Sequence, residues 1–249
     1  MKTPRSITAA WLVAFVVALV PAACKRNDPQ LADATQQAAS ERAADDGAKA
    51  FDAAVAQQNW ALAKAQGDVL LAQYPGSAAA QRVRPQLDDV KAKADAAREQ
   101  SRTAALWSYN AEPVAGTGKA GGTQLSASIY SRDDIDVDGS GAKPVRLIFR
   151  DHPAWGRSSY LVLQAGDFNC YGGCKVMVTV EAATPRSMAA SRPKTDEAIA
   201  MFIEDERALW RLVRDARQIS IEFPVKPSGT RTAVFDVGGL DRAKLPAWN

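Results

Sequence analysis

The spacing of hydrophobic positions changes twice along this chain of 249 residues and divides it into three regions. An apolar run covers residues 7–20, with Thr8 as its one polar residue, and charged residues begin at Lys25. From residue 31 to residue 105, alanine-rich segments place apolar residues three or four positions apart, which indicates α-helix. From residue 106 onward the apolar segments are short, often alternate with polar residues and are bounded by Gly, Pro and Asp, which indicates β-strands.

The helical region is predicted to contain a helical hairpin preceded by a further helical segment. Residues 31–58 carry a thin apolar face that includes Leu31 and Phe51, so this helix needs a neighbour to pack against. The next segment, from Trp60 to Tyr74, is better specified and ends at Pro-Gly-Ser. Pro-Gly breaks the helix, and Ser77 can cap the following one by accepting a backbone N–H.

The spacing Trp-x-x-Ala, then Leu-x-x-Tyr-Pro-x-Ser-x-x-Ala, resembles one tetratricopeptide-type hairpin of the kind found in envelope assembly lipoproteins. We find one copy, whereas a solenoid needs about three repeats to bury a continuous core. The preferred interpretation is a stalk that holds the following domain away from a membrane. The alternative is a dedicated peptide-binding groove.

The third region is predicted to be a globular β domain with one helix. Strands are expected at residues 123–131, 145–151, 160–164, 175–181, 198–203, 218–224 and 232–237. Residues 206–217 should form a helix whose apolar stripe packs onto the sheet. Residues 113–122 form a loop or linker. The predicted fold class is therefore α+β, with a helical hairpin or stalk (31–105) followed by a mostly antiparallel, β-sandwich-like domain with one packed helix (106–249).

The first 23 residues have the layout of a secretory signal peptide: Lys2 and Arg5, then the apolar run, then small residues. The run is shorter than the roughly 18 to 20 residues that a membrane span needs. Ala22-Ala23-Cys24 resembles a bacterial lipobox, which implies that Cys24 carries a lipid and that residues 24–30 are a tether. Pro21 stands where the lipobox usually has an aliphatic residue, so release of a soluble periplasmic protein is the alternative.

The residue after the cysteine is Lys25, whereas an aspartate there tends to retain lipoproteins in the inner membrane. The expected location is therefore the periplasmic face of the outer membrane. The chain has 31 basic and 28 acidic residues, and removal of residues 1–23 takes away two basic residues and no acid. The mature chain is thus close to neutral, without a block of like charge that would bind nucleic acid.

Two further cysteines, Cys170 and Cys174, are predicted to form a structural disulfide. An exported protein with three cysteines must account for the third thiol, and lipidation of Cys24 leaves an even pair. The two glycines between them allow the sharp turn that so short a bridge requires. We expect the bond to hold a hairpin tip between residues 160–164 and 175–181; a redox pair is the alternative.

The acidic segment 133–141 is a candidate for weak calcium binding. Asp134, Asp136 and Asp138 reproduce the first half of a calcium loop, with Gly139 allowing the turn. The twelfth position, which should be a bidentate glutamate, is Val145. The alternative is a solvated turn between two strands, and no other cofactor is predicted.

The single histidine and the aromatic residues beside it are the remaining candidates. A hydrolase would need His152 to activate a nucleophile such as Ser158 or Ser159, but no nucleophile elbow is present. Trp155, Arg157 and Tyr160, with Arg150 nearby, could instead contact a glycan or a protein partner. The alternative interpretation is that these aromatic residues belong to the hydrophobic core.

The closing stretch Phe-Asp-Val-Gly-Gly-Leu completes a pattern that resembles periplasmic accessory proteins of type VI secretion. The resemblance rests on the order of strands and on Phe235, Asp236, Gly239 and Leu240. It implies a non-catalytic envelope factor that acts by contact with other proteins, and it supplies no catalytic residue.

These observations together predict an outer-membrane lipoprotein that binds, or helps to assemble, an envelope complex without catalysing a reaction. Its expected partners are envelope proteins and the membrane, the latter through the lipid on Cys24. The alternative functions are a cell-wall glycan-binding module and, with less support, a hydrolase. The identity of any small-molecule ligand stays open.

Overall fold

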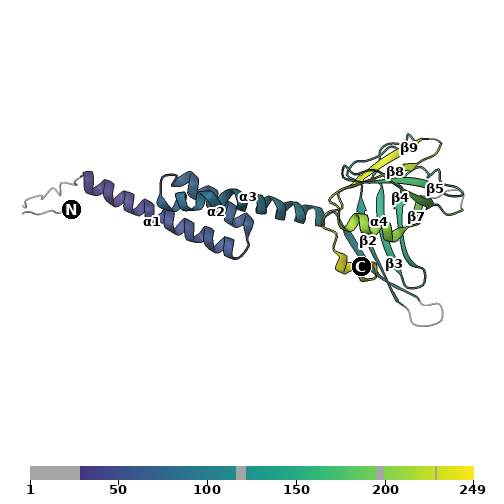
Figure 1. Cartoon of the computed structure of the whole chain (residues 1–249), viewed down its shortest axis with the longest axis horizontal. Helices are drawn as coiled ribbons and strands as arrows, with labels where there is room; N and C mark the ends of the chain where they lie inside the picture. Colours follow the sequence, from purple (N-terminus) through teal and green to yellow (C-terminus); the bar gives the residue numbers. More distant parts are fainter. Residues whose placement is uncertain (1–28, 116–121, 195–198, 228) are drawn as a thin grey trace, which may run out of the picture.

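The structure is a computed structural model, and it describes residues 29–115, 122–194, 199–227 and 229–249. Three helices come first: α1 (Pro29–Ala56), α2 (Trp60–Gln73) and α3 (Ala78–Ala104). A β domain with one further helix follows, and Figure 1 shows the two parts joined end to end. The predicted signal peptide, Cys24 and most of the tether lie outside the described residues. None of the described helices is both long enough and apolar enough to cross a membrane.

The three helices pack side by side over only part of their lengths. Buried apolar residues lie between Ala44 and Ala54 on α1, along α2, and between Ala79 and Ala94 on α3. Phe51 and Leu70 are the largest of these side chains, and both are almost fully buried. At Gly67 a Cβ atom would meet the side chain of Leu87 at 2.6 Å, so the absence of a side chain lets α2 and α3 approach closely.

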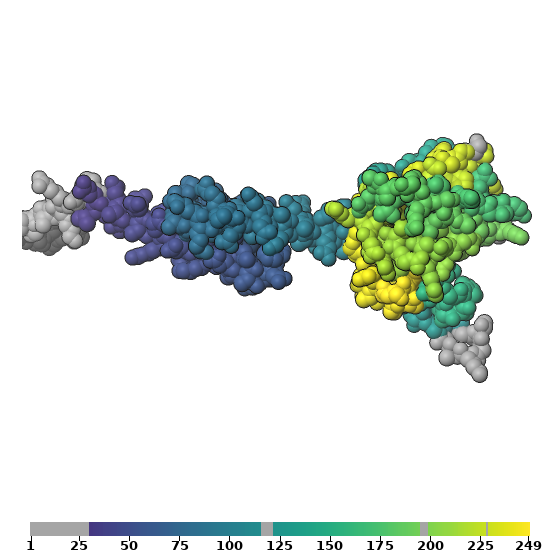
Figure 2. Space-filling model, viewed as in Figure 1, coloured from purple at the N-terminus to yellow at the C-terminus, as the bar shows by residue number. Residues whose placement is uncertain are grey.

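Both long helices extend beyond this packed segment, in opposite directions. Residues 30–40 of α1 and residues 95–102 of α3 are exposed along their whole length. Figure 1 shows the end of α3 as a single helix between the packed bundle and the β domain, and in Figure 2 the same segment is a narrow connection. The helical region is thus a stalk, as expected.

Polar side chains cap the two helices of the predicted hairpin. The Ser77 hydroxyl accepts a hydrogen bond from the Ala80 N–H at 3.1 Å, as the sequence predicted. Asn59 caps α2 in the same way, through the Leu62 N–H at 3.2 Å. These N-terminal caps fix where α2 and α3 begin.

The described strands form one antiparallel sheet in the order β1-β2-β3-β4-β7-β6-β5-β8-β9. Their bounds are β1 (Ser108–Val114), β2 (Gly122–Tyr130), β3 (Arg146–His152), β4 (Gly156–Val162), β5 (Cys174–Val180), β6 (Arg186–Ser191), β7 (Ala200–Ile203), β8 (Ile219–Pro224) and β9 (Thr230–Phe235). The α+β fold class is confirmed. One strand, β6, was not predicted as a separate element from the sequence.

The sheet curls around its core, so that its two ends approach each other. The backbone N–H of Arg132, just after β2, donates to the carbonyl of Val234 on β9 at 2.7 Å. Helix α4 (Glu206–Arg214) and the C-terminal segment with the short helices η1 (Arg242–Lys244) and η2 (Pro246–Trp248) contribute buried side chains to the core of the β domain. Phe149 lies edge-on to Trp210 of α4 and to Trp248 of η2, at ring-centroid distances of 5.2 and 5.3 Å.

One prediction about strand pairing was wrong. Residues 160–164 and 175–181 do not form a hairpin, because β4 pairs with β3 and β7 whereas β5 pairs with β6 and β8. The chain leaves the sheet after β4, passes through the disulfide loop and returns three strands away. Both segments are apolar on one face, and that pattern alone does not select the partner strand.

Candidate binding surface

The outer face of β3 carries two arginines in register with serine and aromatic residues of the neighbouring strands. Leu147 and Phe149 point into the core, so Arg146, Ile148 and Arg150 lie on the opposite face. Arg146 pairs with Tyr130 of β2, and Arg150 pairs with Ser158 of β4. We call this face of β2, β3, β4 and β7, together with Trp155, the basic–aromatic face.

Arg150 lies between two aromatic rings. Its guanidinium carbon is 5.5 Å from the centre of the Trp155 ring and 5.4 Å from the centre of the Tyr160 ring. Its Nε donates to the Ser158 hydroxyl at 3.2 Å. These contacts hold the guanidinium in one orientation and leave its two terminal amino groups without a hydrogen-bond partner among the described residues.

Trp155 is the most prominent exposed ring of the molecule's described part, with 72% of its surface accessible. It stacks on the buried His152 ring, with centroids 3.8 Å apart and planes at 12°. The Nδ1 of His152 accepts hydrogen bonds from the backbone N–H groups of Ala154 and Trp155, at 3.1 and 3.3 Å. The histidine therefore fixes the turn between β3 and β4, and its ring packs against one face of the Trp155 ring.

Arg146 repeats the arrangement at the other end of β3. It lies over the Tyr130 ring at 5.5 Å and donates to the Ser128 hydroxyl at 2.7 Å. Its Nε is buried and has no hydrogen-bond partner among the described residues. Within the same described ranges, neither Arg146 nor Arg150 forms an ion pair.

The predicted contact set of Trp155, Arg157 and Tyr160 is only partly brought together. Arg157 is paired with Asp151 and donates through Nη1 to the Ala247 carbonyl at 2.5 Å, which ties β4 to the C-terminal segment. Arg150, and not Arg157, joins the two aromatic rings. Tyr160 also contacts Phe202 of β7 at 5.1 Å, which extends the aromatic surface across a third strand.

The two serines considered as nucleophiles are engaged elsewhere. The Ser158 hydroxyl accepts from Arg150, and the buried Ser159 hydroxyl donates to the Ile203 carbonyl at 3.4 Å. His152 uses Nδ1 for the turn described above. These three residues thus contribute contacts within the sheet and the β3–β4 turn.

The acidic loop uses its carboxylates to shape its own backbone. Asp136 accepts from the Gly139 N–H at 2.7 Å, and Asp138 accepts from the Ser140 N–H at 2.9 Å. Hydrogen bonds from Ser140 lower the pKa of Asp138. Asp134 is exposed in the same loop. The described residues contain no group of three or more His, Cys, Asp or Glu side chains that could hold a metal ion.

Cys170 and Cys174 form a disulfide with an S–S distance of 2.05 Å. Cys170 is buried in the core, and Cys174 begins β5. The closed loop carries Tyr171 at its tip, with 69% of the residue exposed. The bond therefore fixes the entry to β5, in place of the hairpin that was predicted.

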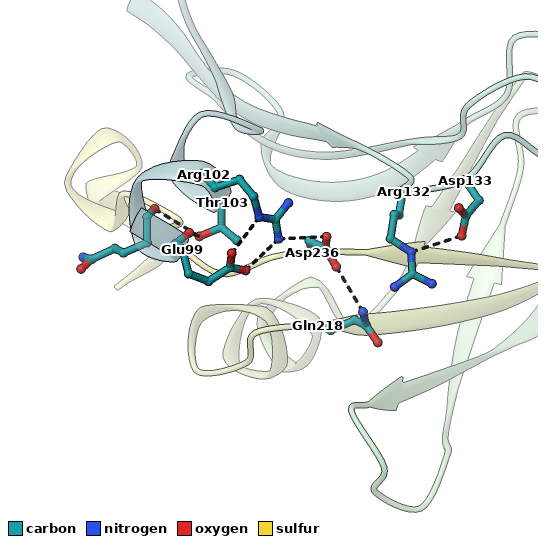
Figure 3. Close-up of polar contacts among 8 residues, drawn as sticks. Glu99, Arg102, Thr103, Arg132, Asp133, Gln218 and Asp236 are labelled. Carbon is teal, nitrogen blue, oxygen red and sulfur yellow. Dashed lines mark hydrogen bonds and ion pairs between the residues drawn. The ribbon is translucent and has the colours of Figure 1, made fainter. Parts of the chain in front are cut away.

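The stalk is attached to the β domain through the stretch that closes the sheet. Arg102 of α3 donates to Glu99 at 2.8 Å and to Asp236 at 3.3 Å, and Gln218 donates to the other oxygen of Asp236 at 3.1 Å (Figure 3). The hydrogen bond from Arg102 lowers the pKa of Glu99, and the same bond is the main reason that the pKa of Arg102 is raised.

Apolar and backbone contacts surround this polar link. The indole N–H of Trp107 donates to the Val237 carbonyl at 3.2 Å, and the Tyr109 hydroxyl accepts from the Asp241 N–H at 2.7 Å. Gly239 has a φ of +75° and lies directly against the backbone of Thr103 and Ala104. Asp236 and Gly239, noted in the sequence as part of a closing pattern, are thus the residues that seat the stalk.

Sequence reasoning did not single out Arg146, Tyr130 and Ser128. Residues 145–151 were predicted to form a strand, and the basic residues in this strand are Arg146 and Arg150. The two-residue period of a strand places both arginines on the same face of the sheet. It does not predict which strand lies beside them or in which register. Only the register shows that each arginine meets an aromatic ring and a serine.

Comparisons with known proteins leave the family open. The sequence matches no family model and no curated protein. Among solved structures, the chain is similar to invasion-associated protein B from Bartonella henselae, with 14% identity and a TM-score of 0.37. The match covers 57% of this chain and 91% of that chain, and nothing about function is drawn from it.

Proposed function

We propose that the chain is an exported, lipid-anchored accessory protein that holds a binding domain at a set distance from the outer membrane and contacts an envelope complex there. The observation that carries the proposal is the seating of α3 on the closing stretch of the sheet (Figure 3). A flexible joint would need neither a glycine pressed against helix backbone nor a carboxylate shared between stalk and sheet. The seating gives the β domain a fixed direction relative to the stalk.

The length of the stalk suits a spacer. At about 1.5 Å per residue, the 28 residues of α1 span about 42 Å, and the exposed end of α3 adds on the order of 15 Å. With Cys24 five residues before α1, the β domain would stand on the order of 60 Å from the lipid surface. Lipoproteins carry several acyl chains, which suffices for stable attachment.

The basic–aromatic face is the surface that we assign to the partner. Exposed tryptophan, tyrosine and arginine are the residue types that dominate binding energy at protein interfaces. Here one of each lies within a single cluster at Trp155, Tyr160 and Arg150. The same cluster supports the second candidate function, a cell-wall glycan-binding module, because Trp155 offers a flat exposed ring for stacking.

The test is in-cell crosslinking of the full chain, followed by mass spectrometry of the co-purified material, beside the Cys24→Ala variant. Recovery of one envelope complex, lost in the variant, is the expected result. Intact mass of the membrane-extracted chain should show an acylated protein that begins at Cys24. An unlipidated chain that starts at Ala23 would end the anchor proposal. Recovery of cell-wall fragments alone would favour the second candidate.

A further inference from the structure

We propose that the basic–aromatic face binds a carboxylate-bearing glycan, with Arg150 and Arg146 each receiving one acidic group. The inference rests on the second candidate function, the cell-wall glycan-binding module, which uses this face. It goes further in naming the chemical class of the ligand. Three observations carry it: two arginines without acidic partners among the described residues, an exposed tryptophan stacked on His152, and two half-buried serines beside Arg150 on the same face.

The positive charge of the two arginines favours an anionic ligand. Arg146 and Arg150 are held by serine hydroxyls and aromatic rings, and neither has a carboxylate within ion-pair distance among the described residues. The buried Nε of Arg146 has no hydrogen-bond partner in the part of the chain that the structure describes, which is rare for a buried polar group in a folded protein. An arginine fork matches the geometry of a carboxylate and binds it through charge-assisted hydrogen bonds.

The spacing of the two arginines favours an extended ligand. They are four residues apart on one strand, which is about 13 Å at 3.3 Å per residue. A single small anion cannot reach both guanidiniums. A chain with acidic groups on successive units can, if it runs along β3.

The aromatic residues favour sugars as those units. The apolar face of a sugar ring stacks on an exposed indole, and Trp155 presents such a ring at one end of the row. Stacking on His152 and the cation–π contact with Arg150 hold that ring in place, which lowers the entropy lost on binding. The half-buried Ser126 and Ser158, on either side of Arg150 in the register, place hydroxyls on the same face for hydrogen bonds to sugar hydroxyls.

An acidic peptide fits the surface less well. Extended peptides gain much of their affinity by adding a strand to a free sheet edge. Both β3 and β4 are paired on each side, so their backbone groups are already used. A peptide on this face would bind through side chains alone.

The experiment measures binding of the full chain to a galacturonate tetramer by isothermal titration calorimetry. The neutral galactose tetramer and a glutamate tetrapeptide serve as comparison ligands. The variants are Arg150→Gln, Trp155→Ala and, as a matched control, Arg132→Gln, since Arg132 is an exposed arginine paired with Asp133 outside the face. Circular dichroism verifies that each variant is folded, and Trp155 is so exposed that its removal leaves the core unchanged.

The expected result is binding of the uronate tetramer that weakens with added salt, weakens about tenfold or more in Arg150→Gln and Trp155→Ala, and is unchanged in Arg132→Gln. Equal binding of the neutral tetramer, equal binding of the peptide, or no uronate binding at millimolar concentration would each overturn the inference. Each of these results leaves the anchored accessory function intact, because the crosslinking test does not depend on the ligand's chemistry. Loss of lipid from Cys24 would remove that function and leave the titration valid.

Discussion

Gly239 lies against the backbone of Ala104 so closely that a Cβ atom at position 239 would be 2.7 Å from the Ala104 Cα. The two residues come from the sheet's closing stretch and from the last turn of the stalk, 135 positions apart in the sequence. No other residue type fits the position, because Gly239 also has a φ of +75°. The contact therefore fixes the attachment of the stalk to the β domain.

Gly239→Ala should lower the free energy of unfolding of the β domain by about 2 to 4 kcal/mol, since left-handed strain and overpacking against backbone add up. Gly139→Ala is the matched control: its φ is +84°, but nothing lies within 4 Å of the added Cβ. The control should lose only about 1 kcal/mol. Urea unfolding followed by tryptophan fluorescence measures both, and equal losses would show that the junction is not closely packed.

Replacement of Cys170 and Cys174 by serine should lower the free energy of unfolding by about 2 kcal/mol, which is the loop-closure entropy expected for so short a loop. Because the two cysteines are only 4 positions apart, the disulfide restricts few residues of the unfolded chain, and a large effect on stability is not expected. Thermal unfolding of the oxidised protein, the reduced protein and the double variant measures it. A loss above about 5 kcal/mol would mean that the loop organises much more of the sheet than its contacts indicate.

Asp167→Asn should destabilise the protein by about 3 kcal/mol at neutral pH, because it removes the carboxylate from the buried Arg192. In the native protein, burial opposes ionisation of Asp167, but hydrogen bonds from Lys226 and Arg192 outweigh it and lower its pKa. A lowered folded-state pKa gives stability above about pH 4 that is lost as the pH falls through that pKa.

The difference between the native chain and Asp167→Asn should therefore shrink below about pH 4. Asp133→Asn, in an exposed pair with Arg132, is the control and should change stability by less than about 1 kcal/mol at any pH. Denaturant titrations at several pH values measure these differences. A constant difference down to pH 2 would contradict the assigned role of Asp167.

Residue patterns predicted the helical region, most strands and the cap at Ser77, because these depend on local spacing and local hydrogen bonds. The strand from 123 to 131 and that from 145 to 151 were each placed within one residue of β2 and β3. Strand β6 was missed because its sequence, Arg-Ser-Met-Ala-Ala-Ser, has little β-branched or aromatic content.

The binding surface could be predicted only in outline. Trp155 and Tyr160 stand out by residue type, but of the two nearby arginines Arg157 is closer to both in sequence than Arg150 is. The odd or even position in β3 and β4, together with the pairing register, sends Arg150 to the outer face and Arg157 toward Ala247. Contacts of this kind depend on tertiary structure, as does the role of Gly239 at the junction.

The most direct test of the proposed function is site-specific photo-crosslinking in intact cells, with a benzophenone amino acid in place of Trp155. Tyr171, an exposed ring away from the basic–aromatic face, is the matched control position. We predict one defined envelope adduct from position 155, none of that size from position 171, and its loss when Cys24→Ala is combined with the crosslinker. The same products from both positions, or an adduct unchanged in Cys24→Ala, would contradict an anchored protein that binds through this face.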